Sequence, residues 1–347
     1  IHSSSGTTGN PTVVLHSAKD LDQWANQVAR CMYMVGLRDT DVFQNTSGYG
    51  MFTGGLGFQY GAEKLGALTV PAAAGNTKRQ IKFITDFGTT CLHIIPSYAT
   101  RLAEVMYEEG IDPRKDTKLH TVCIGAEPHS EEQRKRIEQL LGVKAYNCFG
   151  MSEMNGPGVA FECTEQNGLH IWEDNVIVEI VDPVTLQPVP EGEVGELVLT
   201  TINREAMPLL RYRTRDLTCI LPGDCPCGRT HKRLARFKGR SDDMLILKGV
   251  HLFPIPIEKI LMQFKELGSN YLITLETIGN SDEMLIEVEL SDLFTDDYSA
   301  LQRLTKGITR QLKDELLLTP RIKLVAKGSL PTTDGKAVRV KDHRKLC

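Results

Sequence analysis

The sequence predicts an α/β protein in which a large N-terminal domain precedes a small α+β C-terminal domain. Residues 17–142 alternate helix-like and strand-like patterns, the order that gives a mostly parallel sheet. Short strands and turns follow residue 163, and a helix, two strands, a helix and a strand follow residue 242. A chain of 347 residues also exceeds the size that one core usually serves. The expected parts are a parallel-sheet α/β part over 1–165, a β-barrel-like part over 166–240 and an α+β domain over 241–347.

The helices of the first part are predicted from apolar residues at helical spacing and from favourable caps. Ser17 is a favourable N-cap for a first helix, which Gly36 ends. Ser97 is expected to cap a later helix, and Ser130 with Gln133 has the capping-box spacing. The expected apolar faces are Leu21, Trp24, Val28, Cys31 and Val35; Ile81, Ile84 and Phe87; and Leu102, Val105 and Met106.

Short apolar runs between these helices, and further short runs downstream, are predicted strands. They cover residues 90–95, 119–124 and 143–147 in the first part, and 176–181 and 196–201, with a turn at Asp182 and Pro183, in the second. In the last domain the predicted strands are 271–278, 283–290 and 322–326, and a long helix covers 297–317.

Composition indicates a globular protein that binds small molecules. The net charge of −4 has mixed signs, which gives no basic surface for nucleic acid, and no apolar run is long enough to cross a membrane. Nine cysteines, an odd number with no signal-peptide pattern, fit a reducing compartment, so a cytoplasmic location is expected. Ile1 stands immediately before a functional loop, so we expect the chain to lack an N-terminal segment. The sequence leaves a homodimer open.

The segment from Ser3 to Pro11, Ser-Ser-Ser-Gly-Thr-Thr-Gly-Asn-Pro, has the composition of a loop that wraps around a polyphosphate. Glycines let the backbone approach an anion closely, and serine and threonine add donors without bulk. The loop is not a Walker A sequence, because its glycines are too close together and no Gly-Lys-Ser/Thr triplet follows. An ordinary flexible loop is the alternative.

Polar groups follow two predicted strands, at the edge where open α/β sheets bind ligands. Gly125-Ala126-Glu127-Pro128 could line a base, and Glu153, which follows Phe149-Gly150-Met151-Ser152, could hold magnesium, since that ion favours carboxylate oxygen. Asp216 could bind ribose hydroxyls, and Lys336 is presented by a turn. The alternatives are turns with a solvated glutamate, an aspartate that pairs with an arginine, and a solubilising lysine.

Taken together and in order, six segments resemble the adenylate-forming superfamily of acyl-CoA ligases, and most closely the phenylacetate-CoA ligase family. The resemblance covers essentially the whole chain, and the Arg-Tyr-Arg-Thr-Arg-Asp form at 211–216 is typical of the phenylacetate branch. Members also carry a segment ahead of the first loop, which supports the expected N-terminal loss. The six segments are the loop 3–11, Gly125 to Pro128, Phe149 to Glu153, Arg211 to Asp216, Gly239 to Met244, and Gly335-Lys336.

The resemblance implies two steps that use ATP, Mg²⁺ and coenzyme A. A carboxylate first attacks the α-phosphate of ATP, which gives an acyl-adenylate and pyrophosphate, and the thiol of coenzyme A then displaces AMP. Lys336 is the implied catalytic cation beside the α-phosphate, and Glu153 is the implied magnesium ligand. The implied ATP and AMP contacts are Ser4, Gly6, Thr7, Thr8 and Gly9 around the pyrophosphate; Glu127, Pro128 and Asn147 at the adenine; Asp216 at the ribose; Arg240 near the ribose and phosphate; and Ala126, Phe149, Gly150, Met151 and Ser152 elsewhere in the same site.

The resemblance also implies that the C-terminal domain is mobile and rotates between the two steps. The rotation removes the lysine and opens a path for coenzyme A. Asp242 occupies the hinge position, with a simple linker carboxylate as the alternative. Lys248 and Gly249, followed by Val250 and His251, would face the pantetheine arm.

An acyl pocket is expected between the first strands and helices, with residues 49–55 as its wall. Tyr49 and Phe52 give a flat apolar slot and the glycines leave room for a ring, so an aryl acetate is the expected substrate. The alternative is that both aromatic residues belong to the core. Gly54, Gly125 and Pro157 complete the expected pocket.

Cys225-Pro226-Cys227-Gly228 is a tight knuckle of the kind that supplies half of a zinc site. Two thiolates need two more ligands for tetrahedral closure, and Cys163 and His170 are the most economical partners, with His231 in reserve. Such a site is structural, because four protein ligands leave no open position. The alternative is a set of reduced cysteines that bind nothing.

The leading hypothesis is an ATP-dependent ligase that joins an aryl or acyl carboxylate to coenzyme A. A first alternative adenylates its acid but passes it to another acceptor, and a second is a catalytically silent adenine-nucleotide-binding protein. Lys336 and Glu153 argue against the silent protein, because a pure binder does not need a phosphate lysine together with a metal carboxylate.

Overall fold

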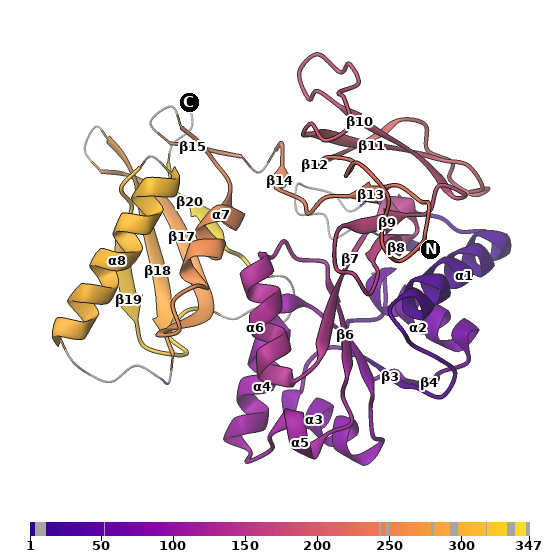
Figure 1. Cartoon of the computed structure of the whole chain (residues 1–347), viewed down its shortest axis with the longest axis horizontal. Helices are drawn as coiled ribbons and strands as arrows, with labels where there is room; N and C mark the ends of the chain where they lie inside the picture. The colour runs from indigo at the N-terminus through magenta and orange to yellow at the C-terminus, as the bar shows by residue number, and fades with distance from the viewer. Residues whose placement is uncertain are drawn as a thin grey trace. The chain divides into compact units, whose positions relative to one another are not determined.

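A computed structural model describes the chain as two compact units (Figure 1). The first unit contains residues 1–126 and 137–241, and the second contains 127–136 and 242–347. Helix α6 (Glu131–Leu141) is therefore shared between them. The residues that the structure describes are 1–3, 12–51, 53–242, 244–247, 250–278, 281–291, 298–316, 318–331 and 337–344.

A mixed sheet of eight strands forms the centre of the first unit, as far as its described residues show. Its middle strands pair in parallel, which confirms the α/β class expected from the alternating pattern. Three strands at one edge of the sheet, which come last in the chain, pair antiparallel. In spatial order the strands are β13 (Arg233–Leu234), β9 (Leu169–Ile171), β8 (Gly156–Glu162), β7 (Lys144–Met151), β6 (Thr121–Gly125), β5 (Cys91–Ile94), β3 (Val42–Asn45) and β4 (Leu68–Val70).

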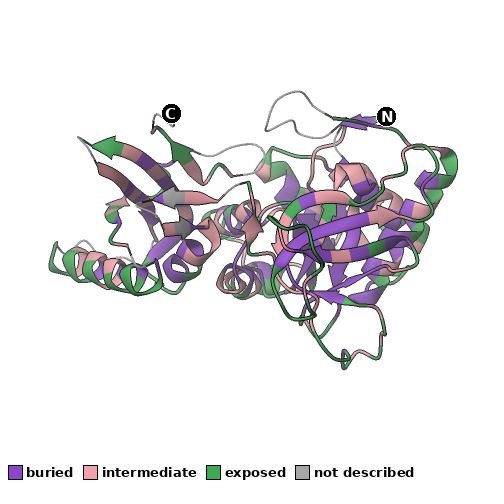
Figure 2. Ribbon diagram, turned by 90° about the horizontal axis from the view of Figure 1, so that it is seen from above, coloured by how far each residue is buried: buried purple, intermediate pink, exposed green. Residues whose placement is uncertain are grey.

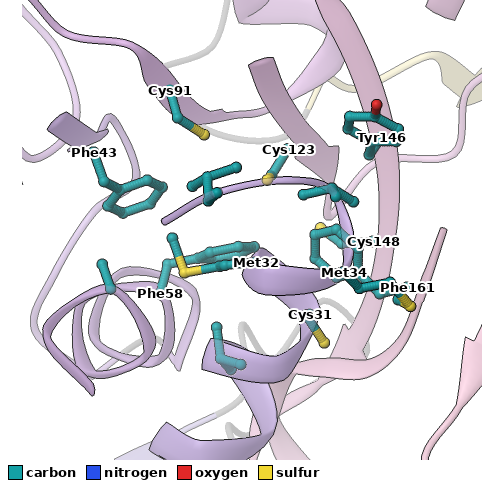
Figure 3. Packing of buried hydrophobic residues seen from close by; sticks show 14 of the residues in the cluster. Cys31, Met32, Met34, Phe43, Phe58, Cys91, Cys123, Tyr146, Cys148 and Phe161 are labelled. Atoms are coloured by element: carbon teal, nitrogen blue, oxygen red, sulfur yellow. The ribbon is translucent and has the colours of Figure 1, made fainter. Parts of the chain in front are cut away.

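Two apolar layers cover the two faces of this sheet, because successive residues of a strand point to opposite faces. On β6, Cys123 packs with one layer while Val122 and Ile124 pack with the other. The first layer contains residues of α1 (Ala18–Met34) and α2 (Thr53–Leu65), and Figure 3 shows its aromatic and sulfur side chains. The second contains residues of α3 (Thr77–Asp86), α4 (Pro96–Glu108) and α6. A one-turn helix, α5 (Pro113–Asp116), follows α4.

The helix caps agree with the sequence at one helix and differ at two. Ser17 caps α1 in a capping box with Asp20, as expected. The prediction for Ser97 is wrong: Ile95 is the N-cap of α4 and Pro96 is its first residue, which suits a proline because it has no N–H to leave unpaired. Ser130 forms half of the expected box, since its Oγ accepts from the N–H of Gln133.

The expected apolar faces hold with one exception. Trp24 and Val28 of α1 are fully buried, as is Ile84 of α3. Phe87 is 51% exposed, because it lies beyond the last turn of α3 as the C-cap residue. Gly36 and Gly142 follow the ends of α1 and α6 with positive φ, the conformation that favours glycine after a helix.

Residues 166–240 are distributed over two sheets. An antiparallel sheet contains β10 (Val176–Val181), β11 (Gly195–Thr201), β12 (Tyr212–Thr218) and β14 (Gly239–Arg240), whereas β9 and β13 extend the large sheet. Apolar residues of β10 and β11 pack with residues of β8 and β9. A hairpin of β1 (His2–Ser3) and β2 (Val13–Val14) begins the chain.

The second unit has the predicted order of helix, two strands, helix and strand, preceded by a hairpin that the sequence did not predict. The helices are α7 (Pro254–Leu261) and α8 (Tyr298–Leu316). The sheet order is β19 (Arg321–Val325), β18 (Ser281–Leu290), β17 (Leu267–Ile278) and β20 (Val340–Asp342), and the hairpin is β15 (Leu245–Leu247) with β16 (Val250–Leu252). Helix α8 buries Leu304, Ile308, Leu312 and Leu316 and exposes its opposite side (Figure 2).

A buried carboxylate organises part of the second unit. Glu258 of α7 accepts hydrogen bonds from the Ser130 N–H at 2.7 Å and the Tyr271 hydroxyl at 3.1 Å. Burial raises the pKa of Glu258, and the hydrogen bond from the Ser130 N–H acts in the opposite direction by lowering it. Because the Ser130 N–H is used in this way, the second half of the capping box predicted with Gln133 does not form.

Asp20 of α1 should stabilise the first unit strongly. It is fully buried and accepts from the N–H groups of Ser17, Glu205 and Ala206 at 2.8–3.0 Å. We expect Asp20→Ala to lower the free energy of unfolding by about 3 kcal/mol, because it leaves buried donors unpaired.

Urea denaturation measures this loss, and Asp22→Ala on the same helix is the matched control. Asp22 pairs with Lys64 on the surface, so its removal should cost at most about 0.5 kcal/mol. Equal losses in the two variants would contradict the role given to Asp20.

Candidate functional site

The carboxyl ends of β6 and β7 lie side by side, and a glycine lets them approach closely. Gly125 is opposite Cys148, and a Cβ on Gly125 would lie 2.4 Å from the Cys148 carbonyl oxygen. The chain then turns at Ala126, which has a φ of 66°. This arrangement brings the segment that begins at Gly125 beside Asn147, which is buried in the neighbouring strand.

The segment from Phe149 to Glu153 covers the end of β7 and the start of the tight connection to β8. β7 runs farther than the sequence predicted, to Met151, and a 3₁₀ turn (Ser152–Met154) follows. Gly150 is again a place of close approach, because a Cβ there would lie 2.1 Å from the Gly156 carbonyl oxygen. The Ser152 hydroxyl lies 3.3 Å from that of Thr53, the first residue of α2. The connection therefore meets the expected wall of the acyl pocket.

Arg204 holds this connection in place. Its buried guanidinium donates to the backbone carbonyl of Glu153 and, at 3.2 Å, to that of Leu15. Burial lowers the pKa of Arg204, and the nearby carboxylates of Asp20 and Glu153 raise it. Glu153 itself is half-buried. The arginine thus joins the segment after β2 to the residue expected to bind magnesium.

Asp216 and Arg240 are neighbours on adjacent strands, and Tyr212 links them electrostatically to Glu153. Asp216 is opposite Arg240 in the pairing of β12 with β14. Burial raises the pKa of Tyr212, the charges of Glu153 and Asp216 raise it further, and Arg240 lowers it. The Phe149 ring lies 4.3 Å, centroid to centroid, from that of Phe237, just before β14. Three of the motifs recognised in the sequence therefore converge within the first unit.

The described residues on either side of the Ser/Thr/Gly loop, residues 3–11, contact Met51 and helix α1. The Ser3 N–H donates to the Met51 carbonyl at 2.8 Å, and the His16 ring stacks on Trp24 at 5.6 Å. Burial lowers the pKa of His16 to about 4, so the ring is neutral at pH 7. The predicted phosphate contacts Ser4, Gly6, Thr7, Thr8 and Gly9 lie outside the described residues.

The expected acyl wall contains a set of hydrogen bonds around Asn45. Its side-chain amide donates to the Gly55 carbonyl at 2.6 Å and to the Tyr49 hydroxyl at 3.3 Å. Burial raises the pKa of Tyr49. Pro157 packs against the same side of the unit, where its carbonyl accepts from the Trp24 indole at 2.9 Å. A Cβ on Gly54 would meet nothing within 4 Å.

Several predicted residues lie outside the described part of the chain: Phe52, Lys248, Gly249 and Lys336. Asp242, the expected hinge, is exposed and is the first residue of the C-terminal segment of the second unit. In that unit, Glu127 accepts from the N–H of Ala337 at 2.6 Å. Both Glu127 and Ala337 belong to the second unit.

Sequence reasoning missed Arg204. This residue lies beyond the end of β11, a strand that pairs antiparallel with both its neighbours, so the rule for the ends of parallel strands does not select it. Thr53 and Tyr212 were named only as members of the expected acyl wall and of the segment 211–216, because their own contacts join segments distant in sequence.

Cys163, His170, Cys225 and Cys227, the residues predicted to share a metal, meet in the first unit. One potential ligand atom from each lies within 4.8 Å of all the others. Burial lowers the pKa of His170 to about 4, so its ring is neutral. His231, the reserve ligand, instead places its ring 5.1 Å from that of Trp172.

Comparison with known proteins gives consistent matches. The family model for AMP-binding enzymes matches residues 1–203, and the model for the AMP-binding enzyme C-terminal domain matches 249–344. The chain is 44% identical over 346 residues to a phenylacetate-coenzyme A ligase of Pseudomonas putida, covering 99% of this chain and 78% of that protein. It is 41% identical over 348 residues to the enzyme of that name from Escherichia coli K12, covering 100% and 79%.

Solved structures give the same result. A 2-hydroxyisobutyryl-CoA ligase in the postadenylation state, in complex with 2-HIB-AMP, superposes with a TM-score of 0.92. It is 31% identical, and the match covers 99% of this chain and 73% of that one. In the described part of the chain, no helix combines the length and apolar character needed to cross a membrane.

His93 should make the stability of the first unit depend on pH. It is buried against the Phe58 ring at 3.8 Å, and burial lowers its pKa to about 3. Between pH 6.5 and 3 the unfolded chain therefore binds more protons than the folded one, so stability falls as the pH falls, by up to about 1.4 kcal/mol per pH unit. We expect His93→Asn to flatten this slope.

The measurement is urea unfolding followed by tryptophan fluorescence at several pH values, since Trp24 and Trp172 both lie in the first unit. His343→Asn, at an exposed position of the second unit, is the control and should leave the slope unchanged. A slope of native size in His93→Asn would contradict this assignment.

Proposed function

Because this chain belongs to the phenylacetate-CoA ligase family of AMP-binding enzymes, we propose that it is an ATP-dependent acid–thiol ligase that converts an aryl acetate-like acid to its coenzyme A thioester. One observation carries the proposal: the pairing of β12 with β14 sets Asp216 opposite Arg240, and both charges act together with that of Glu153 on Tyr212, so residues of three separate family motifs share one environment. A shared environment is expected if the three motifs surround one nucleotide.

In the first step, a carboxylate oxygen of the acid forms a bond to the α-phosphorus of ATP, and the bond from that phosphorus to the bridging oxygen breaks to release pyrophosphate. Lys336 would place a cation beside the charge that develops there. The loop residues Ser4, Gly6, Thr7, Thr8 and Gly9 would hold the leaving pyrophosphate with backbone and hydroxyl donors.

Glu153 suits Mg²⁺ as a partner of the phosphates. Within the described residues its carboxylate has no hydrogen bond or ion pair, while Arg204 fixes its backbone. Carboxylate oxygen is the ligand type that this ion prefers. When bound, Mg²⁺ would neutralise phosphate charge.

The remaining motif residues would hold the adenosine part. Asp216 would accept from the ribose hydroxyls, and Arg240 would lie near the ribose and phosphate. Glu127, Pro128 and Asn147 would border the adenine, with Ala126 and residues 149–152 completing the nucleotide site. The close packing at Gly125 and Gly150 supports this placement, because it fixes the ends of the strands from which these residues come.

In the second step, the coenzyme A sulfur attacks the acyl carbon and AMP leaves with the bonding pair. We infer that residues 241–347 form a mobile domain that turns about Asp242 between the steps. Lys248 and Gly249 would then line the path of the pantetheine arm. The acid would bind near Tyr49, Phe52, Gly54, Gly125 and Pro157, and the contact between Thr53 and Ser152 supports this, because it joins that wall to the nucleotide motifs.

A reducing compartment such as the cytoplasm suits the protein. The eight cysteines of the described residues are all free thiols, and three of them lie with His170 in one cluster. A homodimer remains an open proposal, which size-exclusion chromatography with light scattering would test.

Acid-dependent release of pyrophosphate over a panel of carboxylic acids, with and without coenzyme A, tests the proposed function. We expect release with aryl acetates and thioester only when coenzyme A is present. Release without thioester would favour an enzyme with another acceptor. Nucleotide binding without release for any acid would overturn the proposal in favour of a silent binding protein.

Lys336 should act in the first step alone. We expect Lys336→Ala to slow acyl-adenylate formation by about 1,000-fold, because it removes the cation beside the transferring phosphate. Thioester formation from supplied acyl-adenylate should stay within about threefold of the native rate, because the second step follows the proposed domain rotation and therefore does not use this lysine.

Quenched-flow assays of each half-reaction measure both rates. Lys341→Ala, at an exposed position in β20, is the matched control and should leave both unchanged. Equal losses in the two half-reactions of Lys336→Ala would contradict a role limited to adenylation.

A further inference from the structure

A compact cluster of three cysteines and one histidine has no role in the proposed ligase reaction. Cys163 follows β8, His170 lies in β9, and Cys225 and Cys227 precede β13. Cys163 and His170 are fully buried and Cys225 is 5% exposed. Residues separated by up to 64 positions along the sequence thus place their soft ligand atoms together in the protein interior.

Two distances within the cluster match the edges of a tetrahedron of zinc ligands. Zn–S bonds of about 2.3 Å and Zn–N bonds of about 2.0 Å give S···S edges of about 3.8 Å and S···N edges of about 3.5 Å in a tetrahedron. The sulfurs of Cys163 and Cys225 lie 3.7 Å apart, and the Cys227 sulfur lies 3.4 Å from Nε2 of His170. The largest of the separations is within 4.8 Å.

Neither a disulfide nor simple apolar packing accounts for this arrangement. A disulfide needs sulfurs about 2.05 Å apart, far less than the 3.7 Å between Cys163 and Cys225. Buried thiols do pack as small apolar groups. Apolar packing does not explain why a fully buried imidazole directs a ring nitrogen at a sulfur.

The local backbone is shaped to present the sulfurs to a cation. The Gly228 N–H donates to the Cys225 carbonyl at 3.0 Å, and Gly228 has a φ of 78°, so the knuckle is a tight turn that needs glycine.

We propose that Cys163, His170, Cys225 and Cys227 bind one structural Zn²⁺. Three thiolates and an imidazole select a borderline-soft ion with tetrahedral geometry. Four protein ligands complete its coordination, so the ion takes no part in catalysis.

The ion would hold together the weakest edge of the large sheet. β9 and β13 have three and two residues, and His170 is itself paired with Arg233 across them. So few ladder hydrogen bonds give little stability on their own. β8 lies next in the sheet and pairs with β7. Zinc would therefore fix β8, the strand with which the segment from Phe149 to Met151 pairs.

Metal analysis of the native chain, expressed and purified without a metal column or added zinc, tests the proposal. We expect about one zinc per chain, falling below about 0.1 in Cys225→Ser and Cys227→Ser. Cys219→Ser is the matched control, because Cys219 is buried nearby but outside the cluster, and it should keep its zinc. Native protein with less than about 0.1 zinc per chain, or equal loss in the control, would overturn the proposal.

A second measurement on the native chain keeps the test decisive if the serine variants fail to fold. Replacement of zinc by Co²⁺ should give the visible absorption of a tetrahedral cobalt–thiolate centre. Titration with a mercurial should release one zinc as three thiols react. A cobalt spectrum of octahedral type, or release of zinc without thiol modification, would place the metal elsewhere and refute the assignment. All these readouts are independent of ligase activity.

Discussion

The proposed nucleotide site depends on how closely β6, β7 and β8 approach one another at their ends. Gly125 faces the backbone of Cys148, and Gly150 faces that of Gly156, at distances that no side chain could occupy. A methyl group at either position would have to push apart two backbones, which cannot move aside as a flexible side chain can. The motif residues on both sides of each glycine would then lose their register.

Buried charges position the rest of the site around these strands. Asp20 accepts from the N–H groups of Glu205 and Ala206, so it fixes the residues that follow Arg204. Arg204 in turn holds the carbonyl of Glu153. A buried charge is tolerated when hydrogen bonds replace its lost water, and here those bonds connect segments far apart in sequence. Helix α1 thereby determines the position of a carboxylate that belongs to a different part of the chain.

Features set by neighbouring residues could be predicted from the sequence, and features set by distant ones could not. The Ser17 cap, the parallel strands and the helix faces follow from local rules, and the family motifs identified the nucleotide residues. Ser130 has the correct spacing for a capping box, but a carboxylate from residue 258 takes its N–H. β9 and β13 join the large sheet through tertiary pairing that a strand pattern does not specify. The roles of the Ser/Thr/Gly loop and Lys336 remain predictions.

The sulfur-rich layer beneath α1 and α2 gives the first unit a natural reporter of its own opening. Cys31, Cys123 and Cys148 lie in this layer (Figure 3). Burial raises the pKa of Cys31 to about 12 and that of Cys148 well above its usual value. Alkylating reagents attack the thiolate, so these groups are inert while the layer is closed. The rate at which they become labelled in native buffer therefore measures how often the layer transiently separates from the sheet.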